Sequence, residues 1–186
     1  MTARFRFSDS INLIKNIRTT GTITPSSKNL VRRLLSPINF AEGPRNFFVR
    51  PGNGWGYPFQ VKRLGAQSLL GCLEVNNEFV AQLNCVEDSR LRVYNACASS
   101  LRQILDELGI DKVDYVVSSL PLALIDHDIV ESILVEVDSN LKEGGRFLQY
   151  QYSLANYSDM KPFFRDVKLK FTLRNMPPAF VYECTK

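Results

Sequence analysis

Hydrophobic and polar positions follow two different periods along most of the chain. From about residue 46, short apolar runs typical of buried strands alternate with segments in which apolar residues recur at helical spacing. The predicted strands are Asn46–Val49, Ser68–Val75, Arg90–Tyr94, Val113–Ser118 and Gly145–Tyr152. The predicted helices between them are Tyr57–Leu64, Glu78–Cys85, Ala98–Leu108 and Ile129–Leu141. This alternation predicts an α/β fold with a mostly parallel sheet and helices on both faces.

The two ends of the chain have other patterns. Two amphipathic helices are predicted before residue 46, the first over residues 8–19 and the second after a serine cap at residues 26–27. Near the carboxyl terminus, Val167–Leu173 and Phe180–Glu183 are β-prone, and the segment between them is too short for a crossover helix. We therefore expect one antiparallel pair at the end of the parallel sheet.

Composition excludes several classes of protein. With 186 residues, 45% of them hydrophobic and 23% charged, the chain is long enough for one globular domain with a sizeable core. No run approaches the roughly 18 apolar residues of a spanning helix, and we expect no secretory signal. Four scattered cysteines and a single histidine do not form a zinc-binding pattern, which favours a reduced, cytoplasmic protein.

Charge is distributed unevenly. The net charge is +4, but the first 33 residues hold seven basic residues and one acidic residue, so the rest of the chain is slightly acidic. A basic segment on an acidic body predicts an anionic partner for that segment. Nucleic acid and an acidic membrane surface both fit this pattern.

Polar or glycine-rich turns follow four of the predicted strands, where open parallel sheets bind their ligands. These candidates are Pro51, Gly52, Asn53 and Gly54; Glu74 and Val75; Asn95 and Ala96; and Ser118, Ser119 and Leu120. The glycines let a backbone approach an anionic ligand, the carboxylate can accept ribose hydroxyls, and the amide can pair with an adenine edge. The serine turn offers hydroxyls and carbonyls to an amine. Each segment also fits a plainer interpretation as a surface turn or a solvated helix start.

A set of aromatic residues follows the serine turn in the sequence. Tyr150 and Tyr152 alternate on one predicted strand, so their side chains share a face, and Tyr157, Phe180 and Tyr182 follow. Aromatic rings attract methylated ammonium groups by about 0.5–2 kcal/mol. Aromatic residues on strands are also common in hydrophobic cores, so both interpretations stay open.

Five blocks of the chain resemble the small bacterial phosphatidylethanolamine N-methyltransferases, which are class I methyltransferases. These blocks are Ile14–Ser27, Cys72–Val80, Val113–Leu122, Gly144–Tyr152 and Arg174–Tyr182, of which the last three are the most specific. The resemblance implies a Rossmann-like sheet of seven strands with a C-terminal antiparallel pair and preceding N-terminal helices. It also implies S-adenosylmethionine as cofactor.

The same resemblance implies the chemistry and the residues that carry it. The expected reaction is methyl transfer to the head-group amine of phosphatidylethanolamine, towards phosphatidylcholine. The expected catalytic residues are Ser118, Ser119, Leu120 and Tyr152. The expected cofactor-binding residues are Pro51, Gly52, Asn53, Gly54, Glu74, Val75, Asn95, Ala96 and Ser118. The expected substrate-binding residues are Tyr150, Tyr152, Arg174, Asn175 and Tyr182.

The resemblance also implies different roles for the two parts of the chain. Residues 1–40 are expected to form basic amphipathic helices that contact the membrane and cover the active site, and residues 41–186 the methyltransferase domain. We expect a monomer at the inner face of the cytoplasmic membrane, with no metal and no nucleic-acid partner.

One motif departs from the family pattern, which reads acidic–apolar–Gly–Pro–Gly–x–Gly. Pro51–Gly54 matches its tail, whereas Phe48 stands at the acidic position and Arg50 at the first glycine. A positive charge beside a sulfonium is unfavourable. A weakened or inactive lipid-binding member, or an error in the coding sequence over residues 43–60, is therefore an alternative to an active enzyme. An RNA adenine methyltransferase is a further alternative.

Overall fold

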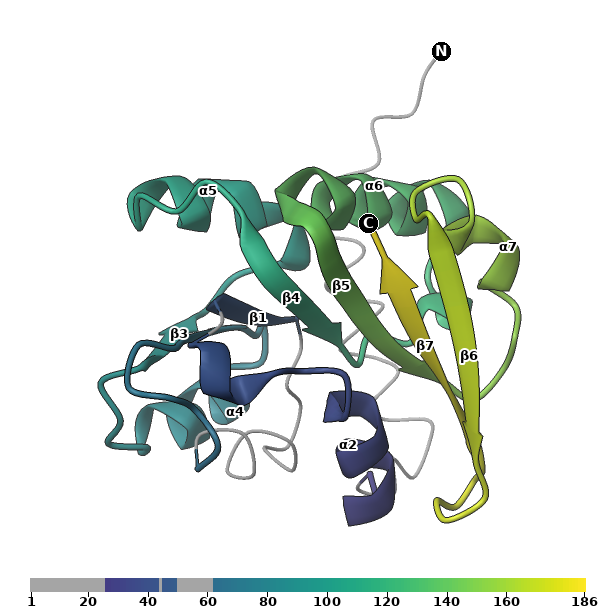
Figure 1. Cartoon of the computed structure of the whole chain (residues 1–186), viewed down its shortest axis with the longest axis horizontal. Helices are drawn as coiled ribbons and strands as arrows, with labels where there is room; N and C mark the ends of the chain where they lie inside the picture. Colours follow the sequence, from purple (N-terminus) through teal and green to yellow (C-terminus); the bar gives the residue numbers. More distant parts are fainter. Residues whose placement is uncertain (1–25, 44, 50–61) are drawn as a thin grey trace.

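Seven strands form one mixed sheet in the computed structural model, which describes residues 26–43, 45–49 and 62–186, the second range as backbone only (Figure 1). The strands are β1 Arg45–Val49, β2 Leu69–Leu73, β3 Leu91–Tyr94, β4 Val113–Ser118, β5 Leu141–Gln151, β6 Asp166–Thr172 and β7 Ala179–Thr185. Their order is β3-β2-β1-β4-β5-β7-β6. Neighbours are parallel except that β7 runs antiparallel to both β5 and β6, which confirms the predicted sheet and its antiparallel pair.

Helices connect these strands. They are α2 Lys28–Leu35, α4 Asn77–Asn84, α5 Leu101–Glu107, α6 His127–Asn140 and α7 Tyr157–Met160, with 3-10 turns η1 Phe40–Glu42, η2 Ala98–Ser100 and η3 Leu122–Leu124. The Ser27 hydroxyl accepts a hydrogen bond from the Leu30 N–H at 3.1 Å, so the predicted serine cap begins α2. The helix predicted over residues 8–19 lies outside the described residues, as does most of Tyr57–Leu64.

Two hydrophobic layers cover the two faces of the sheet. The helices α5, α6 and α7 contribute to one layer, whereas α2 and α4 contribute to the other, and Figure 1 places α2 and α4 below the sheet and α5 and α6 above it. In the second layer, Leu30 and Leu35 are fully buried with Leu70, Cys72 and Leu148. The described part of the first 40 residues thus packs against the sheet, and the predicted division of roles at residue 40 stays a prediction.

β5 begins earlier than its sequence predicts. Leu141 pairs with Val113, and the strand then passes an irregularity before its regular register with β4 resumes. Gly144 has a φ of 73°, and a Cβ on Gly145 would lie 2.8 Å from the Lys142 carbonyl oxygen. The two glycines thus allow a distorted strand that begins before the predicted start at Gly145.

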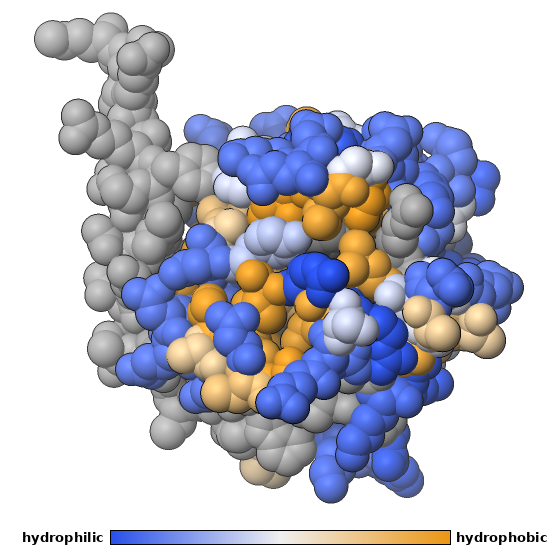
Figure 2. Space-filling view, turned by 90° about the vertical axis from the view of Figure 1, so that its left-hand side faces the viewer, coloured by the Kyte–Doolittle hydropathy of each residue, from blue (hydrophilic) through white to orange (hydrophobic). Residues whose placement is uncertain are grey.

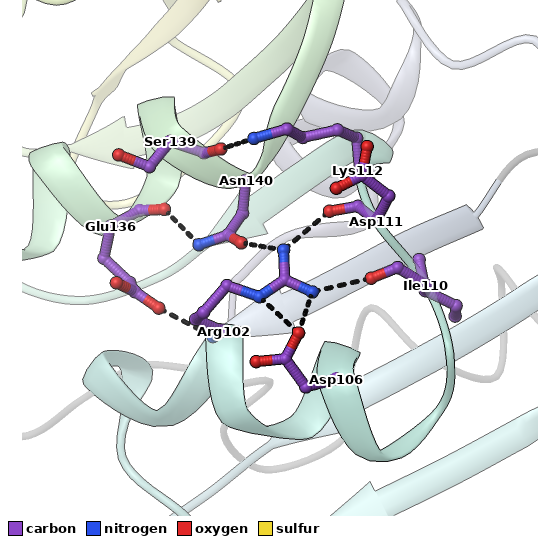
Figure 3. Close-up of polar contacts among 8 residues, drawn as sticks. All are labelled: Arg102, Asp106, Ile110, Asp111, Lys112, Glu136, Ser139 and Asn140. Atoms are coloured by element: carbon purple, nitrogen blue, oxygen red, sulfur yellow. Dashed lines mark hydrogen bonds and ion pairs between the residues drawn. The ribbon is translucent and has the colours of Figure 1, made fainter.

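A guanidinium joins α5 to α6 at the edge of the sheet where β4 begins (Figure 3). Arg102 donates to the carbonyls of Ile110 and Asp111 and to the Asn140 side chain, and it forms an ion pair with Asp106 at 2.7 Å. Its backbone N–H also donates to the Glu136 carboxylate at 2.6 Å. One side chain therefore satisfies carbonyls that a tight loop would leave without partners.

The short strand β3 forms one lateral edge of the sheet, and β6 forms the other. Figure 2 views the molecule from the side of β3 and shows hydrophobic side chains near the centre of the face, surrounded by hydrophilic ones. β3 has four residues and carries the exposed Arg92, features that limit pairing with another chain. Among the described residues, no helix is long and apolar enough to cross a membrane.

Candidate active site

The carboxyl ends of the parallel strands bring the candidate residues to one edge of the sheet. Strand order reverses between β1 and β4, which is the position where open α/β sheets form their ligand crevice. Glu74 follows β2 on one side of this position, and Ser118 ends β4 on the other. Arg50 and Pro51–Gly54, which follow β1 between them, lie outside the described residues.

Glu74 is buried, with 2% of its surface exposed. Its backbone N–H donates to the Tyr94 carbonyl at 3.0 Å, which ties the residue to β3, and its Oε1 accepts from the Asn76 N–H at 2.9 Å. Asn76 in turn caps α4 by accepting from the N–H groups of Glu78 and Phe79. The carboxylate is therefore held in a fixed orientation at the end of β2, as a ribose-binding acid requires.

The turn after β3 lies beside this acid. Asn95 is exposed, and its amide donates to the Asn77 side chain at the start of α4. Ala96 is partly buried against the core. The two turns are thus linked, and the Asn95 amide keeps further hydrogen-bonding capacity for a base edge.

Ser118, Ser119 and Leu120 form a tight turn after β4. Ser118 is 3% exposed, and its Oγ accepts from the Leu120 N–H at 3.2 Å. The Leu120 carbonyl accepts from Gln149 at 2.8 Å and from Gln151 at 3.1 Å. The same oxygen also accepts from the Leu122 N–H at 2.9 Å, so three donors meet it. The Leu120 side chain is also buried, and contact of Ser118, Ser119 and Leu120 with an amine stays a prediction.

Tyr150 and Tyr152 lie together at the end of β5, as predicted from their alternation. Their rings meet edge to face with centroids 5.9 Å apart. Tyr152 is 45% exposed, but burial of the rest of its side chain raises its pKa. The neighbouring Tyr150 also raises this pKa, whereas a hydrogen bond with Asn175 lowers it. The structure thus joins three of the predicted substrate residues into one cluster.

The turn that precedes α2 is attached to this cluster. Asn175 accepts from the Ser27 N–H at 2.8 Å, and the Ser27 hydroxyl donates to the Arg174 carbonyl at 2.7 Å. Ser26 donates to the Tyr150 hydroxyl at 3.0 Å. The exposed side chain of Arg174 therefore lies at the same edge as the tyrosine pair.

Tyr182 lies on the other face of the sheet. It pairs with Gln149 across β5 and β7, is fully buried, and donates its hydroxyl to the Ser153 carbonyl at 2.9 Å. Burial raises its pKa to about 12. Because Tyr182 lies directly across from Gln149, it occupies the face of the sheet opposite to Tyr150, and its predicted contact with the substrate stays a prediction.

Two functional candidates were not identified from the sequence. Gln149 and Gln151 occupy alternate positions of β5, on the face that otherwise buries Phe147 and Tyr182. Polar residues at inward positions of a strand need buried partners, and that pattern is the signal that could have identified them. In the described part of the chain, no group of three His, Cys, Asp or Glu residues could hold a metal ion.

Comparison with known proteins first concerns sequence. No family model matches the chain. An ornithine lipid N-methyltransferase of Singulisphaera acidiphila is 34% identical over 85 residues, which is 45% of this chain and 44% of that protein. The match thus spans less than half the length of the curated relative.

Solved structures give a broader likeness. A precorrin-6y C5,15-methyltransferase from Geobacter metallireducens superposes with a TM-score of 0.69 at 14% identity, covering 90% of this chain and 94% of that one. A Burkholderia thailandensis 1,6-didemethyltoxoflavin-N1-methyltransferase, solved with S-adenosylhomocysteine, gives a TM-score of 0.70 at 12% identity, covering 96% and 86%. Together with the strand order, these likenesses establish that the chain has the class I S-adenosylmethionine-dependent methyltransferase fold.

Proposed function

We propose that this chain transfers methyl groups from S-adenosylmethionine to the primary amine of a membrane lipid head group, with phosphatidylethanolamine as the substrate. The observation that carries the proposal is the position of the buried Glu74 and the Ser118–Ser119 turn on opposite sides of the switch point between β1 and β4. The curated relative supports an amino lipid, because its name describes a lipid N-methyltransferase.

The described residues fit one half of such a cofactor. A fixed, buried carboxylate at the end of β2 suits the two hydroxyls of a ribose, and Glu74 has this position. Asn95 and Ala96 would face the adenine from the next turn. When bound, S-adenosylmethionine supplies a methyl group on a positively charged sulfur.

Ser118 and Ser119 would place the amine in line with the methyl group. The neutral amine forms the new N–C bond as the C–S bond breaks, the C–S bonding electrons remain on the sulfur, and the product nitrogen loses a proton to water. Positioning of this kind and the removal of bulk water are the main contributions of the protein. Tyr150 and Tyr152 would attract the methylated ammonium, and Arg174 would pair with the lipid phosphate.

The edge that carries the candidate site also has apolar side chains directed to solvent. Exposed large hydrophobic residues occur in three loops at the carboxyl edge: Leu124 after β4, Tyr152 and Leu154 after β5, and Leu173 and Met176 after β6. Leu173 and Met176 are 74% and 83% exposed. Such side chains can enter a bilayer interface, so they support peripheral binding at the inner face of the cytoplasmic membrane.

Cations accompany this apolar edge. Lys28, Arg32 and Arg33 on α2 have exposed side chains, and no acidic residue lies in that helix. The turn before α2 is hydrogen-bonded to Asn175 and Arg174 beside the tyrosine pair. Each cation near an anionic surface contributes about 1 kcal/mol, so the helix adds affinity for acidic lipids.

The test is lipid mass spectrometry after expression in a bacterial host that makes phosphatidylethanolamine but no methylated lipids. A second host that also makes ornithine lipid distinguishes the two amino lipids. Methylated phosphatidylethanolamine in the first host supports the proposal. Methylation confined to ornithine lipid would show that ornithine lipid, and not phosphatidylethanolamine, is the substrate. The absence of methylated lipid in both hosts, with vesicle binding retained, would favour a non-catalytic lipid-binding protein that carries Arg50 in place of glycine.

A further inference from the structure

Two buried glutamines hold the turn that follows β4. Gln149 and Gln151 are 0% and 4% exposed and project from the same face of β5. Both side-chain amides donate to one atom, the carbonyl oxygen of Leu120, at 2.8 and 3.1 Å. A single backbone carbonyl outside the strands thus receives two side-chain donors from a neighbouring strand.

These bonds fix the orientation of the turn. Because residue 121 is a proline without an N–H, the carbonyl of Leu120 is the group through which that peptide plane can be held by hydrogen bonds. Besides the two glutamines, this carbonyl accepts from the Leu122 N–H at 2.9 Å, a local bond that closes the turn around Pro121, whereas the glutamines tie the turn to β5. The preceding plane is held by the bond from the Leu120 N–H to the Ser118 Oγ. Gln149 is itself oriented, because its second N–H donates to the Tyr150 carbonyl at 2.8 Å.

The buried position of Gln149 is energetically unfavourable, and the need to fill the core does not explain a polar residue there. Gln149 lies on the face that buries Phe147, Val116 and Tyr182, and its Oε1 has no hydrogen-bond partner among the described residues. A buried acceptor without a partner destabilises the folded state, so an apolar residue of similar volume would be more favourable here. Local rules are commonly broken in this way at functional sites.

We propose that Gln149 and Gln151 are positioning residues: by donating jointly to the Leu120 carbonyl, they fix the Ser118–Leu120 turn in the orientation that aligns the substrate amine. This inference rests on the proposed function, since it assigns the turn to the amine. The inference also identifies the atoms that would accept a hydrogen bond from the amine. Because the Leu120 oxygen is occupied, these acceptors are the oxygen atoms of Ser118 and Ser119.

The geometric part is tested without any activity. Leu120–Pro121 is the single Leu-Pro pair in the sequence, so protein labelled with carbonyl carbon-13 in leucine and nitrogen-15 in proline gives one peak in a carbon-detected correlation spectrum. In the variants Gln149→Met and Gln151→Met, loss of one donor should shift this carbonyl peak upfield, and further in the double variant. An unchanged peak would overturn the inference.

The positioning part is tested by kinetics on amino-lipid vesicles. The double variant should lose about 10- to 100-fold in kcat, because misplacement of the reacting atoms by an ångström is costly, while its affinity for S-adenosylmethionine stays within about twofold of wild type. The single losses should not multiply to the double loss, since both side chains act on one oxygen. Gln151→Met, at the end of the strand, keeps the test informative if Gln149→Met folds poorly.

The matched control is Gln103→Met, an exposed glutamine of α5 that donates to Glu107 at 3.1 Å. It should leave the peak, kcat and cofactor affinity unchanged. An inactive wild-type protein would refute the proposed function and leave the carbonyl peak to decide the geometry. An active wild type with equally active glutamine variants, or variants in which kcat, cofactor affinity and melting temperature fall together, would refute positioning.

Discussion

The substitution Glu74→Gln at the end of β2 tests the proposed cofactor site, because it replaces only one carboxylate oxygen by an amide group. Glu74→Gln keeps the shape of the side chain and the Oε1 that accepts from the Asn76 N–H, so the capped start of α4 should stay intact. The change removes the negative charge that the ribose hydroxyls would meet. We therefore expect a folded protein with weaker binding of S-adenosylmethionine.

The magnitude follows from the hydrogen bonds that lose charge. A hydrogen bond to a charged group contributes about 1.5–3 kcal/mol, and glutamine retains one neutral acceptor. Loss of about one such contribution weakens binding by roughly 10- to 150-fold. Isothermal titration calorimetry with S-adenosylmethionine measures this change directly, and thermal unfolding without ligand checks the fold.

The matched control is Glu143→Gln, which makes the same substitution at an exposed position near the start of β5, at the opposite edge of the sheet. It should bind the cofactor as wild type does. If Glu74→Gln also binds with wild-type affinity, the nucleoside does not lie over β2, and the assignment of this edge as the cofactor site is wrong.

Three further outcomes test the packing and the charges. Arg102→Ala should lower the free energy of unfolding in urea by about 1–3 kcal/mol, because several carbonyls lose their donor, and should leave cofactor affinity unchanged, since the network lies away from the site. Arg90 holds the pKa of Asp88 at about 2, below the unfolded value of about 3.9, so stability present above pH 4 should fall as pH drops towards 2, and Asp88→Asn should lose this dependence in acid titrations followed by circular dichroism. In the native protein a maleimide reagent should label the exposed Cys85 well before Cys72, whose pKa burial raises to about 12; rapid labelling of Cys72 in mass spectra would contradict the buried position of β2.

The fold could be predicted from local patterns because most elements combine a clear period with a clear boundary. The apolar spacing of α2 and its Ser27 cap, and the polar boundaries of β4, each agree with the structure. The start of β5 could not be predicted, because Gly144 and Gly145 signal a turn. The strand extends through them because Leu141 pairs with Val113 of β4 and both glycines form backbone hydrogen bonds with Lys186, directly after β7. Tertiary hydrogen bonds here override the local signal.

The site could be predicted only as a set of loops. Glu74 and the Tyr150–Tyr152 pair follow from strand ends and alternation. The face occupied by Tyr182 could not be predicted, because it depends on the register between β5 and β7. Nor could the occupation of the Leu120 carbonyl, which requires two side chains from another strand to meet one oxygen.

The central claim is tested most directly by following the methyl group itself. Purified protein is incubated with S-adenosylmethionine that carries a deuterated methyl group and with phosphatidylethanolamine vesicles, and the lipids are analysed by fragmenting mass spectrometry. The account predicts a deuterated methyl group on the head-group nitrogen, at a rate that falls in Glu74→Gln and persists in Glu143→Gln. Lipid that stays unlabelled with wild-type protein, under conditions where calorimetry detects bound cofactor, would contradict it.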